Sequence, residues 1–405
     1  MTEDGGQTWR RIDVGRIDGV PDMAFVNHVY PDRHDANIVF AALDNHKNGD
    51  FKPYLIRSDD KGRSWKLMTD GLPERTLVWR LVQDDQKRDL VFVGTENGVY
   101  FSPNRGGQWI ELDGNMPTIS TRDLVIQRRE DDLVAATFGR GFFILDDYAP
   151  LREINDAVLA RDGHLFQLRD AKLYRQRSVT NTSQGDDYYT APNPDFGAVF
   201  TYYLRDGYES LKSQRKSSEK EVEDDEDVPF PGWDALEAER NEESDQVELV
   251  IRDSRGDIVA RVDGRTSKGL HRVAWDLERD ALGPITPGQS SRPSGFLVEP
   301  GSYSATLVRT SDGVEATLSG PVSFNVVPLR EGALPSAPVA TLEAFREQME
   351  ALMTDMTLFG NALDRAEDRA DALRAAHDRA RRPDAGLAAR IVAIHERLGD
   401  LDLKL

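Results

Sequence analysis

Residues 2–9 read Thr-Glu-Asp-Gly-Gly-Gln-Thr-Trp, and two further octets repeat this pattern, SDDKGRSW at 58–65 and SPNRGGQW at 102–109. The shared template is Ser/Thr-x-Asp-x-Gly-x-Thr/Ser-Trp, from which the third copy departs at Asn104 and Gln108. The three tryptophans are separated by 56 and 44 residues. A repeat at this spacing is typical of one four-stranded propeller blade per copy.

Each octet has the composition of a tight hairpin turn. The Asp or Asn side chain can accept backbone N–H groups, the Gly supplies a positive φ angle, the hydroxyl residues close the loop, and the Trp packs in the next strand. The octets are therefore expected to be structural and to link the outer strands of blades. The predicted structural positions are Thr2, Asp4, Gly6, Thr8, Trp9, Ser58, Asp60, Gly62, Ser64, Trp65, Ser102, Asn104, Gly106 and Trp109.

Short runs rich in β-branched and aromatic residues flank the octets, for example 37–42, 89–94 and 98–102. Such runs, bounded by Gly, Asn and Asp, predict strands. Residues 1–155 therefore supply about three blades, whereas propellers close with roughly four to eight. Because the chain opens directly on an octet, we expect further blades to precede it, as in an N-terminally truncated propeller. The alternative is that another chain closes the propeller.

Residues 1–155 resemble the C-terminal blades of the sortilin-type, BNR or Asp-box repeat propellers, a bacterial group often labelled glycosyl hydrolase. The resemblance extends through 132–147, where Gly139-Arg140-Gly141 leads into an aromatic strand and the pair Asp146-Asp147. It implies a secreted or periplasmic full-length protein and a ligand bound at the propeller. Arg140 is the candidate ligand-binding residue, since its flanking glycines let the backbone bend closely. The alternative for Arg140 is an ion pair with Asp146 or Asp147 that fixes the last blade.

Four further segments follow the blades. Residues 156–204 are predicted to be a connector ending in a first sandwich strand, 205–245 an acidic disordered insert, 246–330 an antiparallel β-sandwich, and 338–405 a helical hairpin. The segments 269–277 and 300–303 resemble the immunoglobulin-like domain of flagellar hook-capping proteins. The apolar stripe from Leu342 to Leu373 steps by three and four residues. It is expected to pack on the second helix, or alternatively on a helix of another chain.

The composition excludes several functional classes. The chain has 405 residues, no cysteine and a net charge of -20, so thiol catalysis, disulfides and thiolate metal sites are excluded. The acidic surface disfavours nucleic acid as a partner. No apolar run is long enough to span a membrane. The histidines lack metal-ligand spacing, so neither a metal nor a cofactor is expected.

Glycosidase chemistry requires two carboxyl groups, or a Tyr–Glu pair with an arginine cluster, across a sugar-sized gap. The candidate acids are Asp44, Glu96, Asp123, Asp146 and Asp147, and Arg75, Arg80, Arg122 and Arg140 are candidate channel arginines. Each acid also fits a turn or cap, so no catalytic residue is assigned. The sequence favours a non-catalytic binding protein for a protein, peptide or glycan. The alternative is a secreted, sialidase-like glycoside hydrolase whose catalytic residues lie largely in preceding blades.

Overall fold

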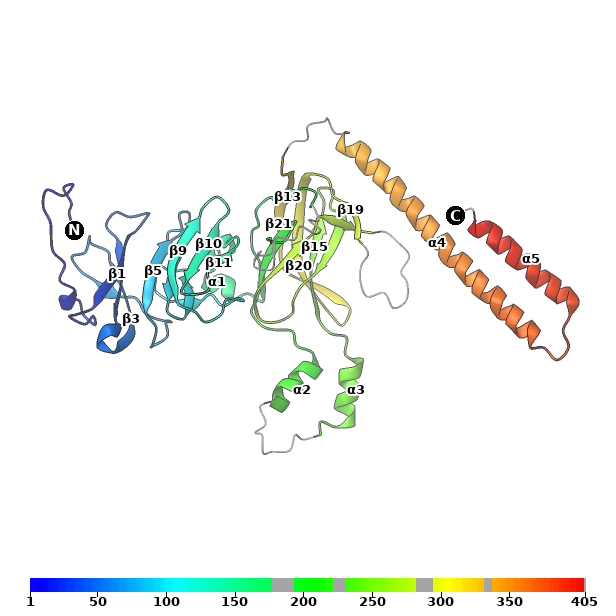
Figure 1. Cartoon of the computed structure of the whole chain (residues 1–405), viewed down its shortest axis with the longest axis horizontal. Coiled ribbons are helices and arrows are strands. Elements are labelled where there is room, and N and C mark those ends of the chain that lie inside the picture. The colour runs from blue at the N-terminus through cyan, green and yellow to red at the C-terminus, as the bar shows by residue number, and fades with distance from the viewer. Residues whose placement is uncertain (177–192, 221–229, 282–293, 331–336, 404–405) are drawn as a thin grey trace. The chain divides into compact units, whose positions relative to one another are not determined.

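The computed structural model describes residues 1–176, 193–220, 230–281, 294–330 and 337–403 (Figure 1). These residues form two compact units, Met1–Asp162 and Gly163–Leu405. The first unit is a partial β-propeller, and the second contains a β-sandwich and a C-terminal pair of helices. The chain is therefore mainly β, as the sequence predicted.

The first unit consists of three antiparallel sheets that follow one another along the chain. In each sheet the strands lie side by side in sequence order, which is the arrangement of a propeller blade. The first sheet contains β1 (Phe25–Pro31), β2 (Val39–Asn45), β3 (Asp50–Ser58) and β4 (Lys66–Leu67). The second contains β5 (Val78–Gln83), β6 (Val91–Thr95), β7 (Gly98–Ser102) and β8 (Ile110–Glu111). The third contains β9 (Thr121–Gln127), β10 (Asp132–Thr137) and β11 (Phe142–Leu145). Short helical turns η1 (Val14–Arg16), η2 (His46–Asn48), η3 (Ala149–Arg152) and α1 (Asp156–Leu159) complete the unit.

The period of two along β2 explains how the first sheet packs on both faces. Phe40 and Ala42 belong to a buried cluster shared with the second sheet, whereas Ala41 and Leu43 belong to a cluster closed by Ile17 and neighbouring residues. β2 is consequently buried along almost its whole length. Its near-continuous apolar sequence is therefore a consequence of burial on both faces.

The third sheet is buried on one side only. Leu124 and Leu133 are buried, whereas Val125, Phe142 and Ile144 are exposed. Val125 and Ile144 both pair with Val134, so they lie on the same side of this sheet. An apolar sheet face of this kind is the surface on which neighbouring blades pack elsewhere in the unit.

The sandwich of the second unit is built from two sheets around one core. One sheet has the order β12 (Gly163–Leu165), β14 (Ala198–Leu204), β17 (Gly269–Trp275). The other has the order β13 (Ala171–Leu173), β21 (Val314–Pro328), β20 (Gly301–Ser311), β15 (Gln246–Arg252), β16 (Ile258–Asp263), and only β13 and β21 pair in parallel. A small ribbon, β18 (Glu278–Asp280) and β19 (Ser294–Leu297), lies outside these two sheets.

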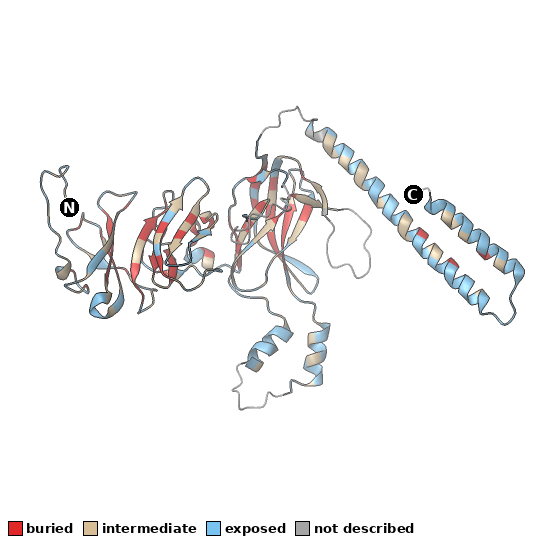
Figure 2. Cartoon of the chain, viewed as in Figure 1, coloured by how far each residue is buried: buried red, intermediate tan, exposed pale blue. Residues whose placement is uncertain are grey.

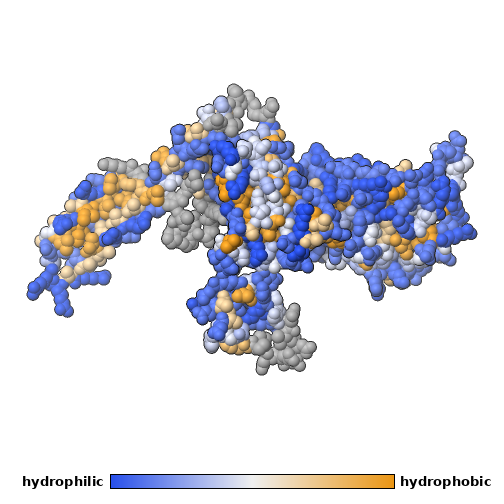
Figure 3. Space-filling view, turned by 180° about the vertical axis from the view of Figure 1, so that it is seen from behind, coloured by the Kyte–Doolittle hydropathy of each residue, from blue (hydrophilic) through white to orange (hydrophobic). Residues whose placement is uncertain are grey.

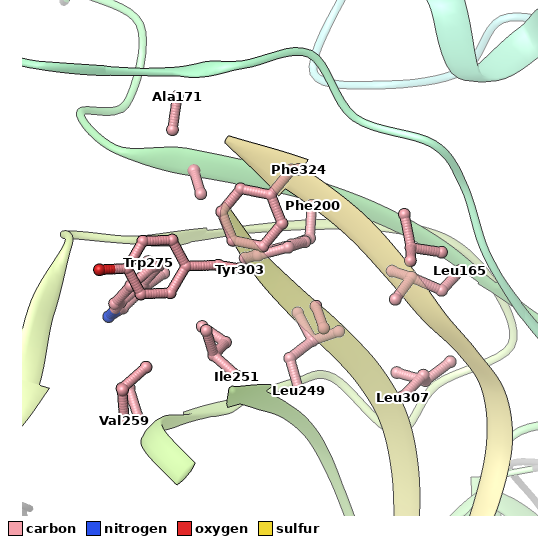
Figure 4. Packing of buried hydrophobic residues seen from close by; sticks show 14 of the residues in the cluster. Leu165, Ala171, Phe200, Leu249, Ile251, Val259, Trp275, Tyr303, Leu307 and Phe324 are labelled. Atoms are coloured by element: carbon pink, nitrogen blue, oxygen red, sulfur yellow. The ribbon is translucent and has the colours of Figure 1, made fainter. Parts of the chain in front are cut away.

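Aromatic rings fill the centre of this core (Figure 4). Trp275 lies edge-on to Tyr303, and Phe200 lies edge-on to Phe324 at a centroid separation of 5.5 Å. The Tyr303 hydroxyl donates a 2.8 Å hydrogen bond to the Glu299 carbonyl four residues upstream. A tyrosine bonded in this way is a feature of immunoglobulin-like sandwiches. The immunoglobulin-like assignment itself stays a prediction.

The acidic insert lies between β14 and β15 and differs from the expected disordered segment in its described parts. It contains α2 (Leu211–Lys220) and α3 (Trp233–Asn241). Arg215 pairs with Glu219 at 2.5 Å and with Glu239 at 2.6 Å, so one arginine offsets acids on both helices. The core of the acidic run, 221–229, lies outside the described residues.

The C-terminal residues form two antiparallel helices, α4 (Val339–Asp378) and α5 (Ala385–Asp402), as the apolar stripes predicted. Asp384 caps α5 by accepting the N–H groups of Gly386 and Leu387. Most of the surface of both helices is exposed (Figure 2), and their shared buried positions are Leu363, Ala370 and Ile391.

Candidate functional site

In each of the three sheets, the turns alternate between the two ends of the strands, because antiparallel strands alternate in direction. We call these two sides of the sheets, where strands begin or end, their edges. One edge, which we call the Asp-box edge, carries the octets that join β3 to β4 and β7 to β8. The opposite edge, which we call the turn edge, carries the starts of β1, β5 and β9 and the turns β2–β3, β6–β7 and β10–β11. Contacts between sheets join like edges: the Asn27 side chain at the turn edge donates to the Val78 carbonyl at 3.1 Å.

The second octet shows how an Asp-box turn is closed. Asp60 accepts hydrogen bonds from the backbone N–H and the hydroxyl of Ser64, at 2.8 and 2.7 Å. Ser58 accepts the N–H of Gly62, whose φ is 73°, at 2.7 Å. The backbone and hydroxyl donors of Ser64 hold the pKa of Asp60 well below its usual range. These bonds are internal to the turn, so the octet holds its own hairpin together.

The other octets close in the same way but differ at their tryptophans. Gly106 N–H donates to Ser102, and Gln108 N–H donates to Asn104 at 2.8 Å, so the third turn forms despite its departures from the template. Trp109 is buried and donates to the Met68 carbonyl. Trp9, expected to pack, is instead 74% exposed, because no described strand follows the first octet directly.

The turn edge holds a stacked cluster centred on Trp79, the second residue of β5. The Arg122 guanidinium lies 3.7 Å from the centroid of the Trp79 ring. Glu96, in the β6–β7 turn, accepts Trp79 Nε1–H at 2.9 Å and the Ser120 hydroxyl at 3.0 Å, and lies 3.7 Å from Arg122. Stacking on Trp79 and the nearby Glu96 carboxylate therefore fix the plane of the Arg122 guanidinium. The Arg122 side chain is still 44% exposed.

Two further pairs of a cation with an aromatic ring continue along the turn edge. Lys47 lies 5.2 Å from the Phe25 ring and Arg75 lies 5.5 Å from the Phe51 ring. Phe138, in the β10–β11 turn, is 73% exposed and also lies within 5.5 Å of the Arg122 guanidinium. This row of cations and exposed rings contrasts with the strongly acidic composition of the whole chain.

Three of the five predicted carboxyl candidates lie at this edge, and each of the three is bonded there. Asp44 is buried and pairs with His46, whose ring contacts Trp79 edge-on at 6.1 Å. Asp123 pairs with Arg80 at 2.8 Å, and Glu96 belongs to the Trp79 cluster. Glu96 also lies in a hairpin turn, as predicted. The remaining candidates, Asp146 and Asp147, come directly after β11, at its Asp-box end.

His28 on β1 lies beside these groups. It accepts the Leu81 N–H through Nδ1 at 3.2 Å. Burial and, as a smaller effect, the positive charge of Arg80 lower the pKa of His28 to about 4. The negative charge of Asp123 opposes this shift only in part. His28 is therefore neutral at physiological pH and acts as a hydrogen-bond acceptor between β1 and β5.

Arg140 occupies the β10–β11 turn, so topology places it at the turn edge near Phe138. Both neighbouring glycines have positive φ, 96° for Gly139 and 73° for Gly141. The structure thus brings Arg75, Arg80, Arg122 and Arg140 to one side of the blades. Sequence reasoning missed Trp79, Phe138 and Ser120. Trp79 follows a valine at the start of a strand and looks like a core residue in the sequence alone.

Among the residues that the structure describes, no group of three or more His, Asp or Glu side chains is placed to hold a metal ion. None of the helices that the structure describes combines the length and the apolar composition needed to span a membrane. The site thus consists of aromatic rings, cations and bonded carboxylates.

No family model and no curated protein sequence matches this chain. Similar solved structures include YCF48 bound to D1 peptide, at 18% identity and a TM-score of 0.27 over 36% of this chain and 43% of that one. An ancestral GH74 enzyme is similar at 13% identity and a TM-score of 0.27 over 76% and 36%. The GH74 xyloglucanase from Xanthomonas campestris is similar at 12% identity and a TM-score of 0.25 over 72% and 38%.

These neighbours are β-propeller proteins, and the chain spans less than half the length of each of the three. They include a peptide-bound protein and glycoside hydrolases, so the similarity does not select an activity. The assignment of a partial propeller rests on the strand order and packing described above.

Proposed function

We propose that this chain is a non-catalytic binding protein whose turn edge recognises an acidic peptide or protein segment. The observation that carries the proposal is the Arg122 guanidinium, stacked on Trp79 and oriented by Glu96. A guanidinium fixed in this way can donate two parallel hydrogen bonds to a carboxylate with little loss of rotamer freedom. The neighbouring exposed rings would contact apolar parts of the same ligand.

The row of cation and ring pairs supports an extended ligand. Lys47 with Phe25 and Arg75 with Phe51 lie in the first sheet and the connection that follows it, and Arg122 and Phe138 belong to the third sheet. Arg140 adds a fourth cation in the turn beside Phe138, and we propose that it contacts the ligand. A segment with acidic and aromatic residues in alternation would match this order of charges and rings.

Binding is favoured over hydrolysis by the state of the carboxyl groups. Glycoside hydrolysis requires a pair of carboxyl groups facing one another across the substrate. Asp44, Glu96 and Asp123 are instead each bonded to a side chain of the turn edge itself. In the glycosidase alternative, the catalytic residues would therefore lie largely in preceding blades. A secreted or periplasmic location of the full-length protein is part of the proposal and rests on the Asp-box resemblance.

The test is a screen of the whole chain against immobilised acidic peptides with aromatic residues, followed by calorimetry on the best binder. Arg122→Ala should weaken binding at least tenfold, because it removes a bidentate, charge-assisted contact. Arg129→Ala is the matched control, since Arg129 is an exposed arginine at the Asp-box edge that pairs with Glu130. Equal loss in both variants would mean that only net charge matters.

Two further arms separate the alternatives. Binding on a glycan array that requires Arg122, without peptide binding, would replace the peptide by an acidic glycan. Turnover of fluorogenic glycosides that disappears in Glu96→Gln or Asp123→Asn would overturn the non-catalytic assignment.

A further inference from the structure

The first half of α4 carries an apolar stripe that α5 does not reach. The helices contain 40 and 18 residues, or about 60 and 27 Å at 1.5 Å per residue. His377 contacts the Asp384 carbonyl, and His395 lies 3.6 Å from Asp371, which fixes the antiparallel register. From this register α5 ends near residue 360 of α4.

The uncovered stripe continues the one that packs on α5. It consists of Leu342, Phe345, Met349, Leu352, Met356 and Phe359, at the same spacing of three and four residues that leads to buried Leu363 and Ala370. Phe345 is 60% exposed and Leu352 is 54% exposed. Figure 3 shows hydrophobic side chains gathered along the helical pair.

The sandwich contacts other residues on these first turns of α4. Arg346 donates to the Leu297 carbonyl at 2.8 Å and pairs with Glu299, while Arg279 lies 3.8 Å from Glu343. At 100° per residue, Glu343 lies opposite Phe345 and Leu352, whereas Arg346 lies on the side of Leu342 and Met349, which are partly buried. The sandwich contacts therefore leave Phe345, Leu352, Met356 and Phe359 exposed.

We propose that this stripe binds a second copy of the same chain, with the two α4 helices antiparallel. In this arrangement the first half of each α4 lies against the second half of the other copy's α4 and against the other copy's α5. Three helices then lie side by side at each end of the dimer. The fit follows from length, because the uncovered half of α4 is as long as the half that α5 covers. The new contact continues the apolar interface between α4 and α5.

The exposed apolar surface contributes to the area that a dimer needs. A stable interface takes about 800 Å² from each partner, and an aromatic side chain alone supplies about 150–250 Å² when buried. The exposed parts of Phe345, Leu352, Met356 and Phe359 supply a share of this area on each copy. The exposed Leu373, Leu387 and Ile394 on the α4–α5 pair extend the surface that the second copy would cover.

The first test is the molar mass of the full chain by light scattering. The wild type should have twice the 45.4 kDa mass of one chain. Phe345→Glu with Leu352→Glu should give the mass of a single chain. The matched control is Ala344→Glu with Ala351→Glu, which has the same spacing and added charge one residue away, on exposed positions off the stripe, and should stay dimeric. A monomeric wild type, or a dimeric Phe345/Leu352 variant, would overturn the proposal.

The second test uses the absence of native cysteine. In the antiparallel register Phe345 of one copy lies near Leu373 of the other. A mixture of Phe345→Cys and Leu373→Cys chains should form a crosslinked heterodimer on oxidation, and neither variant alone should crosslink. Crosslinking of each variant with itself would show parallel helices and contradict the proposed arrangement. This test does not require a charged variant to fold, and it is independent of ligand binding at the turn edge.

Discussion

Arg152 donates two hydrogen bonds to Asp84, from Nε to Oδ2 at 2.9 Å and from Nη2 to Oδ1 at 2.8 Å, across 68 positions of sequence. The Asp84 side chain is fully buried, and it also accepts the Tyr148 hydroxyl at 2.7 Å. Arg152 further bonds both oxygens of Asp131. One guanidinium thus connects the second sheet, the third sheet and the η3 turn.

Arg152→Met should destabilise the first unit by about 3–5 kcal/mol, because it leaves a buried carboxylate without its cation. The measurement is calorimetric unfolding of the whole chain. The control is Arg129→Met, which removes an arginine whose side chain is 82% exposed. A loss below about 1 kcal/mol, the range of surface ion pairs, would show that Asp84 is satisfied without Arg152.

His28 should make the first unit less stable in mild acid. Its pKa is lowered from 6.5 to about 4 in the folded chain. Between these values the unfolded chain binds a proton that the folded chain does not, so this contribution to stability is lost as the pH falls from 6.5 to 4. Denaturant unfolding at several pH values should show a shallower decline for His28→Gln than for the wild type. Parallel pH profiles would contradict the assignment.

The hydroxyl at the first position of each octet should contribute to the free energy of unfolding in proportion to its burial. Ser58→Ala and Ser102→Ala should each cost about 1–3 kcal/mol, because each leaves the N–H of a buried glycine turn without its acceptor. Thr2→Ala should cost less, because the corresponding bond from Gly6 N–H is only partly buried and water can replace it more readily. Urea unfolding measures these losses of stability. Equal losses for all three variants would contradict the prediction that the burial of the hydroxyl sets its contribution.

Gly197→Ala should destabilise the sandwich more than a positive φ alone explains. Gly197 has a φ of 105°, and a Cβ there would lie 1.8 Å from the Trp275 carbonyl oxygen. Gly256→Ala is the matched control, with a φ of 89° and open space around the added carbon. The control should lose about 1–2 kcal/mol and Gly197→Ala clearly more. Similar melting temperatures for the two variants would refute the steric explanation.

The candidate site was only partly predictable. The sequence indicated Arg75, Arg80, Arg122 and Arg140 as candidate channel arginines, and it placed Glu96 in a hairpin turn. The partnership of Trp79 with Arg122 was not predictable, because these residues lie on β5 and β9, in different sheets. Contacts between blades depend on how strand starts align in space, and no local spacing encodes that alignment.

The sequence by itself determined the octet turns, the strands beside them, the sandwich strands and the two C-terminal helices. These features depend on interactions within a few residues, such as Asp60 with Ser64, or on a local apolar period. Tertiary structure decided which tryptophans are buried, how Arg215 holds two helices in the acidic insert, and how much of α4 stays uncovered by α5. Each of these depends on the distance between segments far apart in the chain, which only the folded arrangement sets.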